Sequence, residues 1–324
     1  MAARILLVLA VMISYLSSCL ITGQNLTRHV VKEKGSEIRG PFIGDANKSS
    51  GRTTGGSPIK AASDGYTHVA GYQSKGADGV TAWHGVRAKM SVWKINDVQP
   101  LSESSAYIAA ISNSDGLEYV AAGVHVYPRM HNNSDLRFFT YWKTTKDGTM
   151  KGCYNDYCPG FVIANGSNLL PGQALAPLSD YGGEMRYITI RIKKDEKTGD
   201  WSLYREDQGG PIGGMTLLGW WPQSLFKSLS ERANVIQWTG EVNYQDNETG
   251  PSMGSGHFSD EHEGKAASFS ELYGFDGLGL IYNNYYGAIP FVDKPECYNI
   301  SPWYGSSVKK SQYFFYGGPS GCSH

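Results

Sequence analysis

The amino-acid sequence predicts an all-β protein, an antiparallel β-sandwich of two packed sheets with one short helix. Three observations favour this class. The chain of 324 residues has 40 glycines and 21 tyrosines. Only 18% of all residues are charged. Short apolar runs are separated by turn residues. This composition favours strands and turns over helices. The net charge of −1 gives no support for a nucleic-acid partner.

The predicted strands are short segments rich in β-branched and aromatic residues, bounded by Gly, Pro, Asn or Asp. The segment 185–195 alternates clearly, with Ile188, Ile190 and Ile192 on one face and larger or polar residues on the other. Such alternation indicates a half-buried antiparallel strand. The predicted strands are 66–73, 85–95, 105–112, 119–128, 136–144, 160–164, 185–195, 201–207 and 237–244.

The helix is predicted over residues 222–233. Pro222 stands where a first-turn proline is tolerated, and Leu225, Phe226 and Leu229 recur at helical spacing. We expect this helix to lie across one of the sheets.

The N-terminal segment predicts secretion. Residues 1–23 have one arginine, then an apolar run, then small residues, which is the layout of a signal peptide. The alternative is a membrane anchor, but the apolar run 5–15 is too short to span a bilayer. Residues 24–65 are polar and lack a periodic apolar face, so we interpret them as a flexible arm preceding a domain over 66–324.

Four cysteines remain after the signal peptide, an even number that suits an oxidising route. Three pairings are possible, and local spacing favours Cys153–Cys158 and Cys297–Cys322. The alternative use of the first pair is as two zinc ligands. Glycosylation sequons, which fit a secreted surface, begin at Asn25, Asn47, Asn132, Asn165, Asn247 and Asn299.

Several catalytic motifs are missing from the sequence: it has no P-loop, dinucleotide fingerprint, HExxH or GxSxG elbow. The loop 254–264 crowds His257, His262 and three acidic residues between glycines. A metal site there is one interpretation, and a glycine-shaped turn with a solvated acidic tip is the one we favour. We expect neither a metal nor a cofactor.

Glu241 is the most unusual residue in a predicted strand. It stands in the apolar run "VIQWTGEVNY", where a carboxylate is either solvated on one face or held in place for chemistry. The sequence therefore poses the question of whether Glu241 has a partner.

The ordered motifs "FFTYW", "GCYNDYCPGF", "GWWPQSLF", "VIQWTGE", "MGSGHF", "GKAASF" and "YFFYGGPSGC" resemble those of the neprosin family of plant secreted proteins. The resemblance extends from about Tyr66 to Cys322. It implies an antiparallel β-sandwich in the apoplast or cell wall. It also implies an endopeptidase that cleaves after proline at acidic pH through two glutamates. In such a pair one carboxylate takes a proton from water while the other carboxyl donates one.

The resemblance assigns the second glutamate of the family to Glu241. The first belongs to a family motif, I-E-A-G-W, which matches "VAAGV" here and places Ala121 at the glutamate and Val124 at the tryptophan. Glu118 lies three residues earlier, and in a regular strand it points to the opposite face. His125 shares the face of position 121 and is the other candidate substitute.

Several residues are candidates to line the expected cleft: Tyr141, Trp142, Trp238 and His257. With one glutamate absent, we expect weak or lost peptidase activity. A second interpretation is a non-catalytic extracellular protein that binds a proline-rich peptide or a cell-wall glycan. A third is a structural glycoprotein without a ligand. The family resemblance makes a proline-containing peptide or a cell-wall component the expected partner, with no membrane association after signal cleavage.

Overall fold

The computed structural model describes residues 65–74, 82–146, 148–206, 214–279, 281–282, 288–306 and 311–323. All of them belong to one of two compact units of the chain, residues 40–324. The predicted signal peptide, nearly all of the predicted arm, and the sequons at Asn25 and Asn47 lie outside the described residues.

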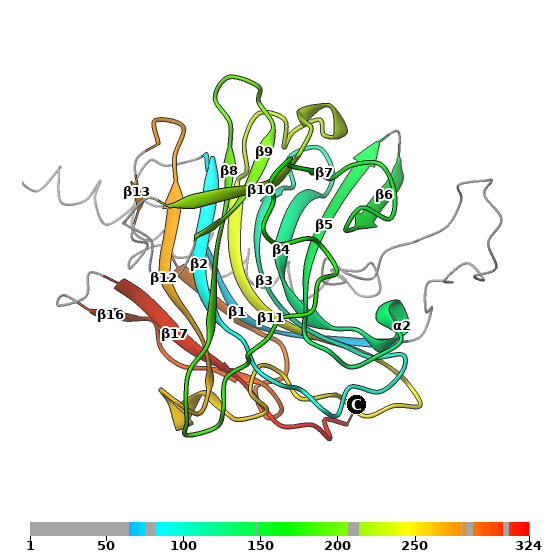
Figure 1. The fold of residues 1–324 in the computed structure, drawn as a ribbon, viewed down its shortest axis with the longest axis vertical. Coiled ribbons are helices and arrows are strands. Elements are labelled where there is room, and N and C mark those ends of the chain that lie inside the picture. Colours follow the sequence, from blue (N-terminus) through cyan, green and yellow to red (C-terminus); the bar gives the residue numbers. More distant parts are fainter. Residues whose placement is uncertain are drawn as a thin grey trace, which may run out of the picture. The chain divides into compact units, whose positions relative to one another are not determined.

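Two antiparallel sheets form the fold, as predicted (Figure 1). The first has seven strands in the order β14-β1-β11-β3-β4-β5-β6. Its strands are β1 (Gly65–Ser74), β3 (Glu103–Ser112), β4 (Glu118–Val126), β5 (Arg137–Lys146), β6 (Thr149–Tyr154), β11 (Val235–Gln245) and β14 (Ala288–Val292).

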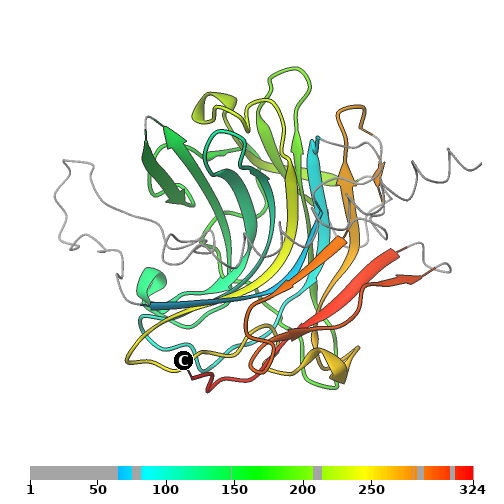
Figure 2. The same cartoon turned by 180° about the vertical axis from the view of Figure 1, so that it is seen from behind.

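The second sheet has the main order β15-β17-β12-β2-β8-β9-β10-β7, with β13 beside β12 and β16 beside β17. Its strands are β2 (Gly85–Ser91), β7 (Val162–Ile163), β8 (Tyr187–Lys194), β9 (Trp201–Glu206), β10 (Met215–Trp221), β12 (Ala267–Phe275), β13 (Ile281–Tyr282), β15 (Asn299–Ile300), β16 (Tyr304–Ser306) and β17 (Ser311–Gly317). Strands β6, β10 and β12 to β17 were not among the predicted segments. Long strands of both sheets curve along their length when seen from either side (Figure 1; Figure 2).

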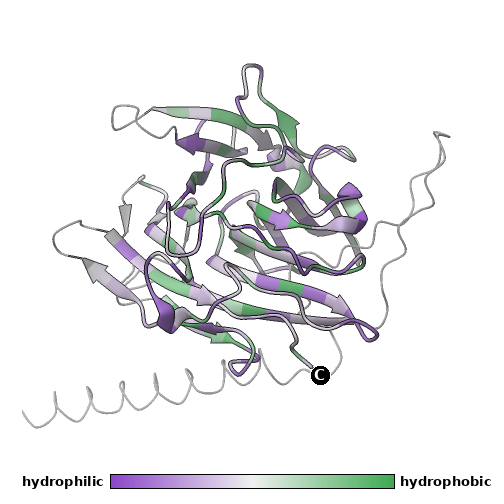
Figure 3. Ribbon diagram, turned by 60° about the horizontal axis from the view of Figure 1, so that its bottom comes forward, coloured by the Kyte–Doolittle hydropathy of each residue, from purple (hydrophilic) through white to green (hydrophobic). Residues whose placement is uncertain are grey.

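The main core lies between the sheets. In β8, Ile188, Ile190 and Ile192 are buried, as the alternation predicts, and they join Ile108 of β3 and Val120 of β4 in one hydrophobic cluster. The hydropathy of the ribbon changes repeatedly along individual strands (Figure 3). This alternation is what a sheet with two different faces requires.

The helix predicted over residues 222–233 is wrong. This segment contains only a 3-10 turn, Gln223–Leu225, followed by irregular backbone. The buried Glu118 carboxylate accepts hydrogen bonds from the backbone N–H groups of Lys227 and Leu229, at 2.9 Å each, and from the Thr144 hydroxyl at 2.6 Å. Because these N–H groups bind the carboxylate, they are not used in i to i−4 helical bonds.

Among the described residues, a short α-helix lies elsewhere, at α2 (Pro128–His131), directly after β4. None of the helices in the described ranges is long and apolar enough to cross a membrane. Both predicted disulfides are confirmed, Cys153–Cys158 and Cys297–Cys322, with Cα atoms 6.2 and 5.6 Å apart. The zinc alternative for the first pair is thereby excluded.

Replacing Glu118 by Gln should destabilise the protein by about 2–3 kcal/mol, because the charged acceptor of three hydrogen bonds is lost and an amide N–H₂ group faces backbone donors. Urea unfolding monitored by tryptophan fluorescence measures the change. Glu184→Gln, at an exposed ion pair with Arg186, is the matched control and should cost less than about 0.5 kcal/mol. Equal stability of the two variants would contradict this role of Glu118.

Candidate functional site

Glu241 lies on the face of the seven-stranded sheet that points away from the second sheet. Its neighbours in β11, Trp238 and Val242, pack in the core between the sheets. Side chains alternate along a strand, so Glu241 points the other way. It is in register with Ser105 of β3, and Ser105 is in register with His125 of β4. We call this outward side of the sheet the Glu241 face.

Two donors hold the Glu241 carboxyl, which is 0% exposed. The Tyr107 hydroxyl donates to its Oε2 at 2.8 Å, and Nδ2 of Asn243 donates to its Oε1 at 2.9 Å. The Thr67 hydroxyl donates to Oδ1 of Asn243 at 2.6 Å, which fixes the amide with its N–H₂ group toward the carboxyl. Glu241 is therefore built into a polar network instead of facing solvent.

A glycine lies beside Tyr107, on the side of β3 away from Glu241. In the register of β3 and β4, Gly123 is directly opposite Tyr107. A Cβ atom at position 123 would lie 2.7 Å from the Cβ of Tyr107 and 2.0 Å from the carbonyl oxygen of Ala106. Only glycine permits this close approach of strand and ring.

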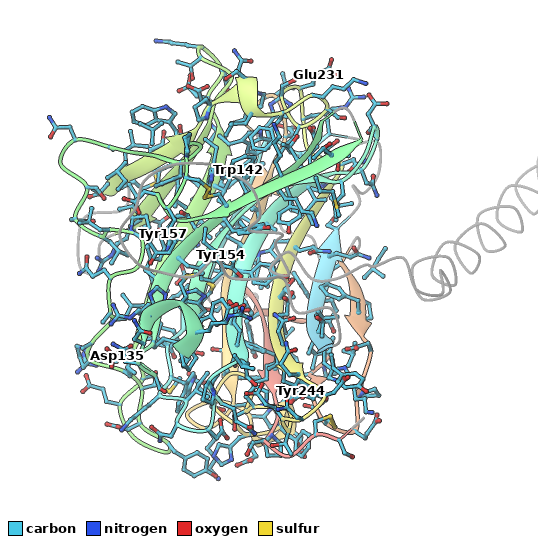
Figure 4. The ribbon with its side chains drawn as sticks, turned by 90° about the vertical axis from the view of Figure 1, so that its right-hand side faces the viewer. Asp135, Trp142, Tyr154, Tyr157, Glu231 and Tyr244 are labelled. Carbon is cyan, nitrogen blue, oxygen red and sulfur yellow. A yellow bond between two sulfur atoms is a disulfide. The ribbon has the colours of Figure 1, made fainter. Side chains whose placement is uncertain are left out.

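A second buried carboxyl, Glu103, lies on the same face. It begins β3, two residues before Ser105, and is 2% exposed. Nδ1 of His125 lies 2.8 Å from its Oε1, and the Tyr154 hydroxyl donates to its Oε2 at 3.2 Å. Asn243 of β11 is in register with Glu103 of β3, and its side chain acts to lower the pKa of the Glu103 carboxyl, so Asn243 lies beside both glutamates. Figure 4 shows Tyr154 above the coil of α2.

Burial sets the electrostatics of the pair. It raises the pKa of Glu241 to about 8 and that of Glu103 to about 8, and the charge of Glu103 further raises the pKa of Glu241. Burial likewise lowers the pKa of His125 to about 3. Burial therefore favours the neutral form of both the Glu103 carboxyl and the neighbouring His125 imidazole.

Ala121 does not lie across from Glu241, contrary to what the family resemblance implies. It is in register with Ala109 of β3, which is in register with Gln237 of β11. Ala121 is thus separated from Glu241 by two strand spacings, about 10 Å, and by four residues along the strands, about 13 Å. The register is set by hydrogen bonding across three strands, which a motif match does not reveal.

The two other candidate partners are placed differently. Glu118 points to the inner side of the sheet, as its odd offset from position 121 predicts, and there it holds the 226–229 loop. It is therefore not a partner of Glu241. His125 lies on the Glu241 face, but its ring nitrogen contacts Glu103.

The expected cleft residues separate into three places. Tyr141 lies on the Glu241 face, in a small hydrophobic cluster with Tyr107 and Tyr119. Trp142 and Trp238 do not, because their even positions turn them into the main core. His257 contacts Glu261 at 2.8 Å and the ring of Tyr181 at 4.2 Å, in a loop beside β17.

The sequence interpretation missed Glu103, Tyr107 and Asn243. A usable signal was present: Glu103, Ser105 and Tyr107 alternate in one strand, as do Glu241 and Asn243 in another. The apolar run that follows Glu103 drew the predicted strand boundary to Ser105, two residues too late.

The predicted modification and metal sites are distributed as follows. Asn132, Asn165 and Asn247 are exposed, whereas Asn299 is half-buried and its side chain accepts a hydrogen bond from the Ser259 N–H. Over the residues that the structure describes, no group of three or more His, Cys, Asp or Glu side chains is placed to hold a metal.

Comparisons with known proteins bear on this site. Residues 99–319 match a family model described as Neprosin. Among solved structures, the chain is similar to scytalido-glutamic peptidase, crystallised with a peptide-based transition-state analogue. That similarity has a TM-score of 0.34 and 9% identity, and covers 78% of this chain and 99% of that chain. The family match, which spans well over half of the chain, is the finding that bears on function.

The free energy of unfolding should increase as the pH falls from about 8 to about 6.5. In this window the folded chain retains protons on Glu103 and Glu241, whereas the unfolded chain, with an ordinary carboxyl pKa of 4.5, has released them. Stability from a raised carboxyl pKa is present at low pH and lost as the pH rises through the folded pKa. Below 6.5 the lowered pKa of His125 opposes the effect, because the unfolded histidine then gains a proton.

Urea unfolding at pH 6.5 and 8 checks this expectation. The double variant Glu103→Gln/Glu241→Gln should lose most of the difference between the two pH values, while Glu184→Gln should keep it. A double variant with the pH dependence of the parent would show that these carboxyls ionise normally.

Introducing a glutamate at position 121 should destabilise the protein and should not increase peptidase activity. Ala121 is 0% exposed beside Tyr107, Tyr119 and Tyr141, so Ala121→Glu buries a bulky carboxyl in an apolar cluster. We expect a loss of about 3 kcal/mol or more in the free energy of unfolding. Ala121→Gln and Ala121→Leu separate the cost of the charge from that of the volume. A stable Ala121→Glu variant with increased peptidase activity would contradict the observed register.

Proposed function

The chain belongs to the Neprosin family, and on that basis we propose that it is a glutamic-type endopeptidase whose acid–base pair is Glu241 and Glu103. The observation that carries this proposal is the placement of two buried carboxyls on one sheet face beside Asn243, which donates to Glu241 and is in register with Glu103. The second carboxyl comes from β3, and the Ala121 position of β4 is not used. Loss of the family glutamate therefore does not leave Glu241 alone.

Peptide hydrolysis by such a pair needs one ionised and one protonated carboxyl. Glu241 is suited to the base, because both of its oxygens accept hydrogen bonds from side chains that stabilise a carboxylate. It takes a proton from water as the water oxygen attacks the scissile carbonyl carbon. Glu103 is suited to the acid, and it donates its proton to the leaving amine as the C–N bond breaks.

We propose a proline-containing peptide as the substrate class, with cleavage after proline. The support is the family match, together with a cluster of aromatic rings on the Glu241 face, formed by Tyr107, Tyr119, Phe139 and Tyr141, which are buried in this structure and would contact a peptide only when uncovered. Aromatic surfaces accept proline rings without a large loss of conformational entropy. The same cluster supports a second candidate function, the binding of a proline-rich peptide or a cell-wall glycan without cleavage.

A secreted location is part of the proposal. The two disulfides are of the kind that persists in oxidising compartments, and three sequons are exposed where glycans can be attached. Detection of glycosylated protein in the medium of cells that express the full chain tests this location.

Substituting either carboxyl should abolish most of the peptidase activity. Cleavage of a proline-containing peptide library, followed by mass spectrometry, should be reduced about 10²–10⁴-fold in Glu241→Gln and in Glu103→Gln. Because burial raises the pKa of Glu241, the acid limb of kcat/KM should lie well above the ordinary carboxyl value of 4.5. The family resemblance implies cleavage at acidic pH. The expected acid limb lies at a higher pH than such cleavage would require.

The exposed Glu231→Gln is the control and should retain full activity (Figure 4). Cleavage that survives Glu103→Gln but not Glu241→Gln would contradict the assigned pair. Peptide binding by the parent protein and by Glu241→Gln, with no cleavage by either at any pH, would favour the binding function. Binding of a cell-wall glycan alone would identify the other ligand class.

A further inference from the structure

The outward face of the second sheet has no part in the proposed peptidase. Val86 and Met90 of β2, with Ile190 of β8, pack in the core between the sheets. Side chains alternate along a strand, so the odd-numbered residues of β2 and β8 point outward. Strands β12, β2, β8 and β9 are neighbours in this order (Figure 1). We call the outward side of these four strands the Arg191 face, after a residue of β8.

A row of two arginines between two tyrosines crosses the Arg191 face. Tyr273 of β12 is in register with Arg87 of β2, and Arg87 with Arg191 of β8. Arg191 is in turn in register with Tyr204 of β9, so the row spans three strand spacings, about 14 Å. All four side chains are half-buried, which leaves each of them partly accessible to solvent.

Aromatic rings hold the two guanidinium groups of the row. Cζ of Arg87 lies 5.3 Å from the centre of the Tyr273 ring. Cζ of Arg191 lies 5.1 Å from the centre of the Tyr204 ring and 5.5 Å from that of Phe275. Because a ring attracts a cation that lies over its face, the two positive charges have fixed places on the sheet.

The two arginines differ in their anionic partners. Nε of Arg87 donates to Glu206 at 2.6 Å, and its Nη2 donates to Glu271 at 2.9 Å. Nε of Arg191, by contrast, is buried and has no hydrogen-bond partner among the described residues. Burial lowers the pKa of Arg191, and the charge of the nearby Glu206 offsets only part of that effect. A guanidinium that is partly withdrawn from water without a bonded anion favours the binding of an anion from outside.

A β-bulge brings Glu271 to the Arg191 face. The register of β12 with β2 shifts between Ser270 and Tyr273, and Glu271 within this bulge has a φ of 50°. A non-glycine residue in this left-handed region is strained and persists only where its surroundings hold it. Arg87 holds Glu271, because its Nη1 donates to the carbonyl oxygen at 2.8 Å while its Nη2 binds the carboxylate. Arg87 thus has a structural role, and Arg191 is the arginine that is left for a ligand.

Cations outnumber carboxylates on the Arg191 face. Lys89 of β2 and Lys193 of β8 add to the two arginines, against the carboxylates of Glu206 and Glu271. We propose that this face binds a polysaccharide whose sugar rings carry carboxylate groups. A guanidinium pairs with a carboxylate through two parallel hydrogen bonds, and the C–H groups of a sugar ring pack on the face of a tyrosine ring. A chain of such sugars repeats both groups along its length, as the row across the strands does.

Two features of the face favour this ligand over other polyanions. Glu206 and Glu271 can accept hydrogen bonds from sugar hydroxyls, whereas they repel the closely spaced phosphates of a nucleic acid. The exposed large apolar side chains of the described residues all lie outside the four strands. Within the described ranges, the face therefore lacks the apolar groups that insert into a lipid surface.

Binding of polygalacturonate to the full chain, measured by isothermal titration calorimetry at low salt, tests the proposal. Arg191→Gln should weaken binding about tenfold, because a charge-assisted hydrogen bond to the carboxylate is lost. Lys89→Gln, at a side chain that is 31% exposed and outside the core, should weaken it about threefold. The matched control is Arg186→Gln, which removes the same charge from the exposed ion pair with Glu184 and should bind as the parent does. Urea unfolding checks that each variant is folded.

Further probes separate the ligand classes. Methyl-esterified polygalacturonate has the same sugars without the charges and should bind about tenfold more weakly than polygalacturonate. Dextran sulfate and double-stranded DNA carry other anions and should also bind more weakly. Equal binding of the esterified polymer would show that the charges are not recognised. Equal or tighter binding of dextran sulfate or DNA would show that the face attracts any polyanion.

Either of these results would overturn the proposal. It would also be overturned if the parent did not bind polygalacturonate, if Arg191→Gln and Lys89→Gln both bound as the parent does, or if Arg186→Gln lost as much affinity as Arg191→Gln. No peptide enters these measurements, so their outcome does not depend on the peptidase proposal.

Discussion

The burial of both faces of the central strands of the seven-stranded sheet, β3, β4 and β11, is the constraint on which the rest of the structure depends. All nine residues of β4 are buried, and β3 beside it and β11 beyond β3 are nearly as enclosed. An antiparallel sheet in a sandwich usually has one face packed on the core and one face exposed to solvent. Here the inner face is filled by apolar side chains, whereas the Glu241 face holds carboxyl, amide, hydroxyl and imidazole groups that must satisfy one another.

That requirement explains the proton distribution on the Glu241 face. Two carboxylates cannot both be charged in an enclosed site without a cation beside them, so burial raises the pKa of Glu103 and of Glu241. Each carboxyl then shares its proton or accepts bonds from Asn243, Tyr107, Tyr154 or His125. Buried carboxyls that keep a proton near neutral pH can donate and accept protons in a reaction. The burial of Glu103 and Glu241 is thereby linked to the proposed acid–base function.

Glu118 shows a different use of a buried carboxyl in the same strand system. It lies on the inner side, and its oxygens satisfy two backbone N–H groups of a loop that buries Leu229 and Phe226 against the core. The same residue type, fifteen positions after Glu103, thus has a structural role because its partners are backbone donors. Strand parity separates the two roles: even positions of β4 face the core, and odd positions face the polar network.

Composition and the two-residue period are local properties, and they were enough to predict the all-β class, the two disulfides, about half of the described strands and the inner face of β8. The sequence also showed that Glu241 is an unusual residue for a strand, and it predicted that the Glu118 side chain points to the face opposite to that of position 121. Only the tertiary structure decided that Glu103 and not Ala121 accompanies Glu241, since the pairing depends on the register of three strands that are distant in sequence. It likewise decided that residues 222–233 do not form a helix, because a carboxylate more than a hundred residues away binds their backbone N–H groups.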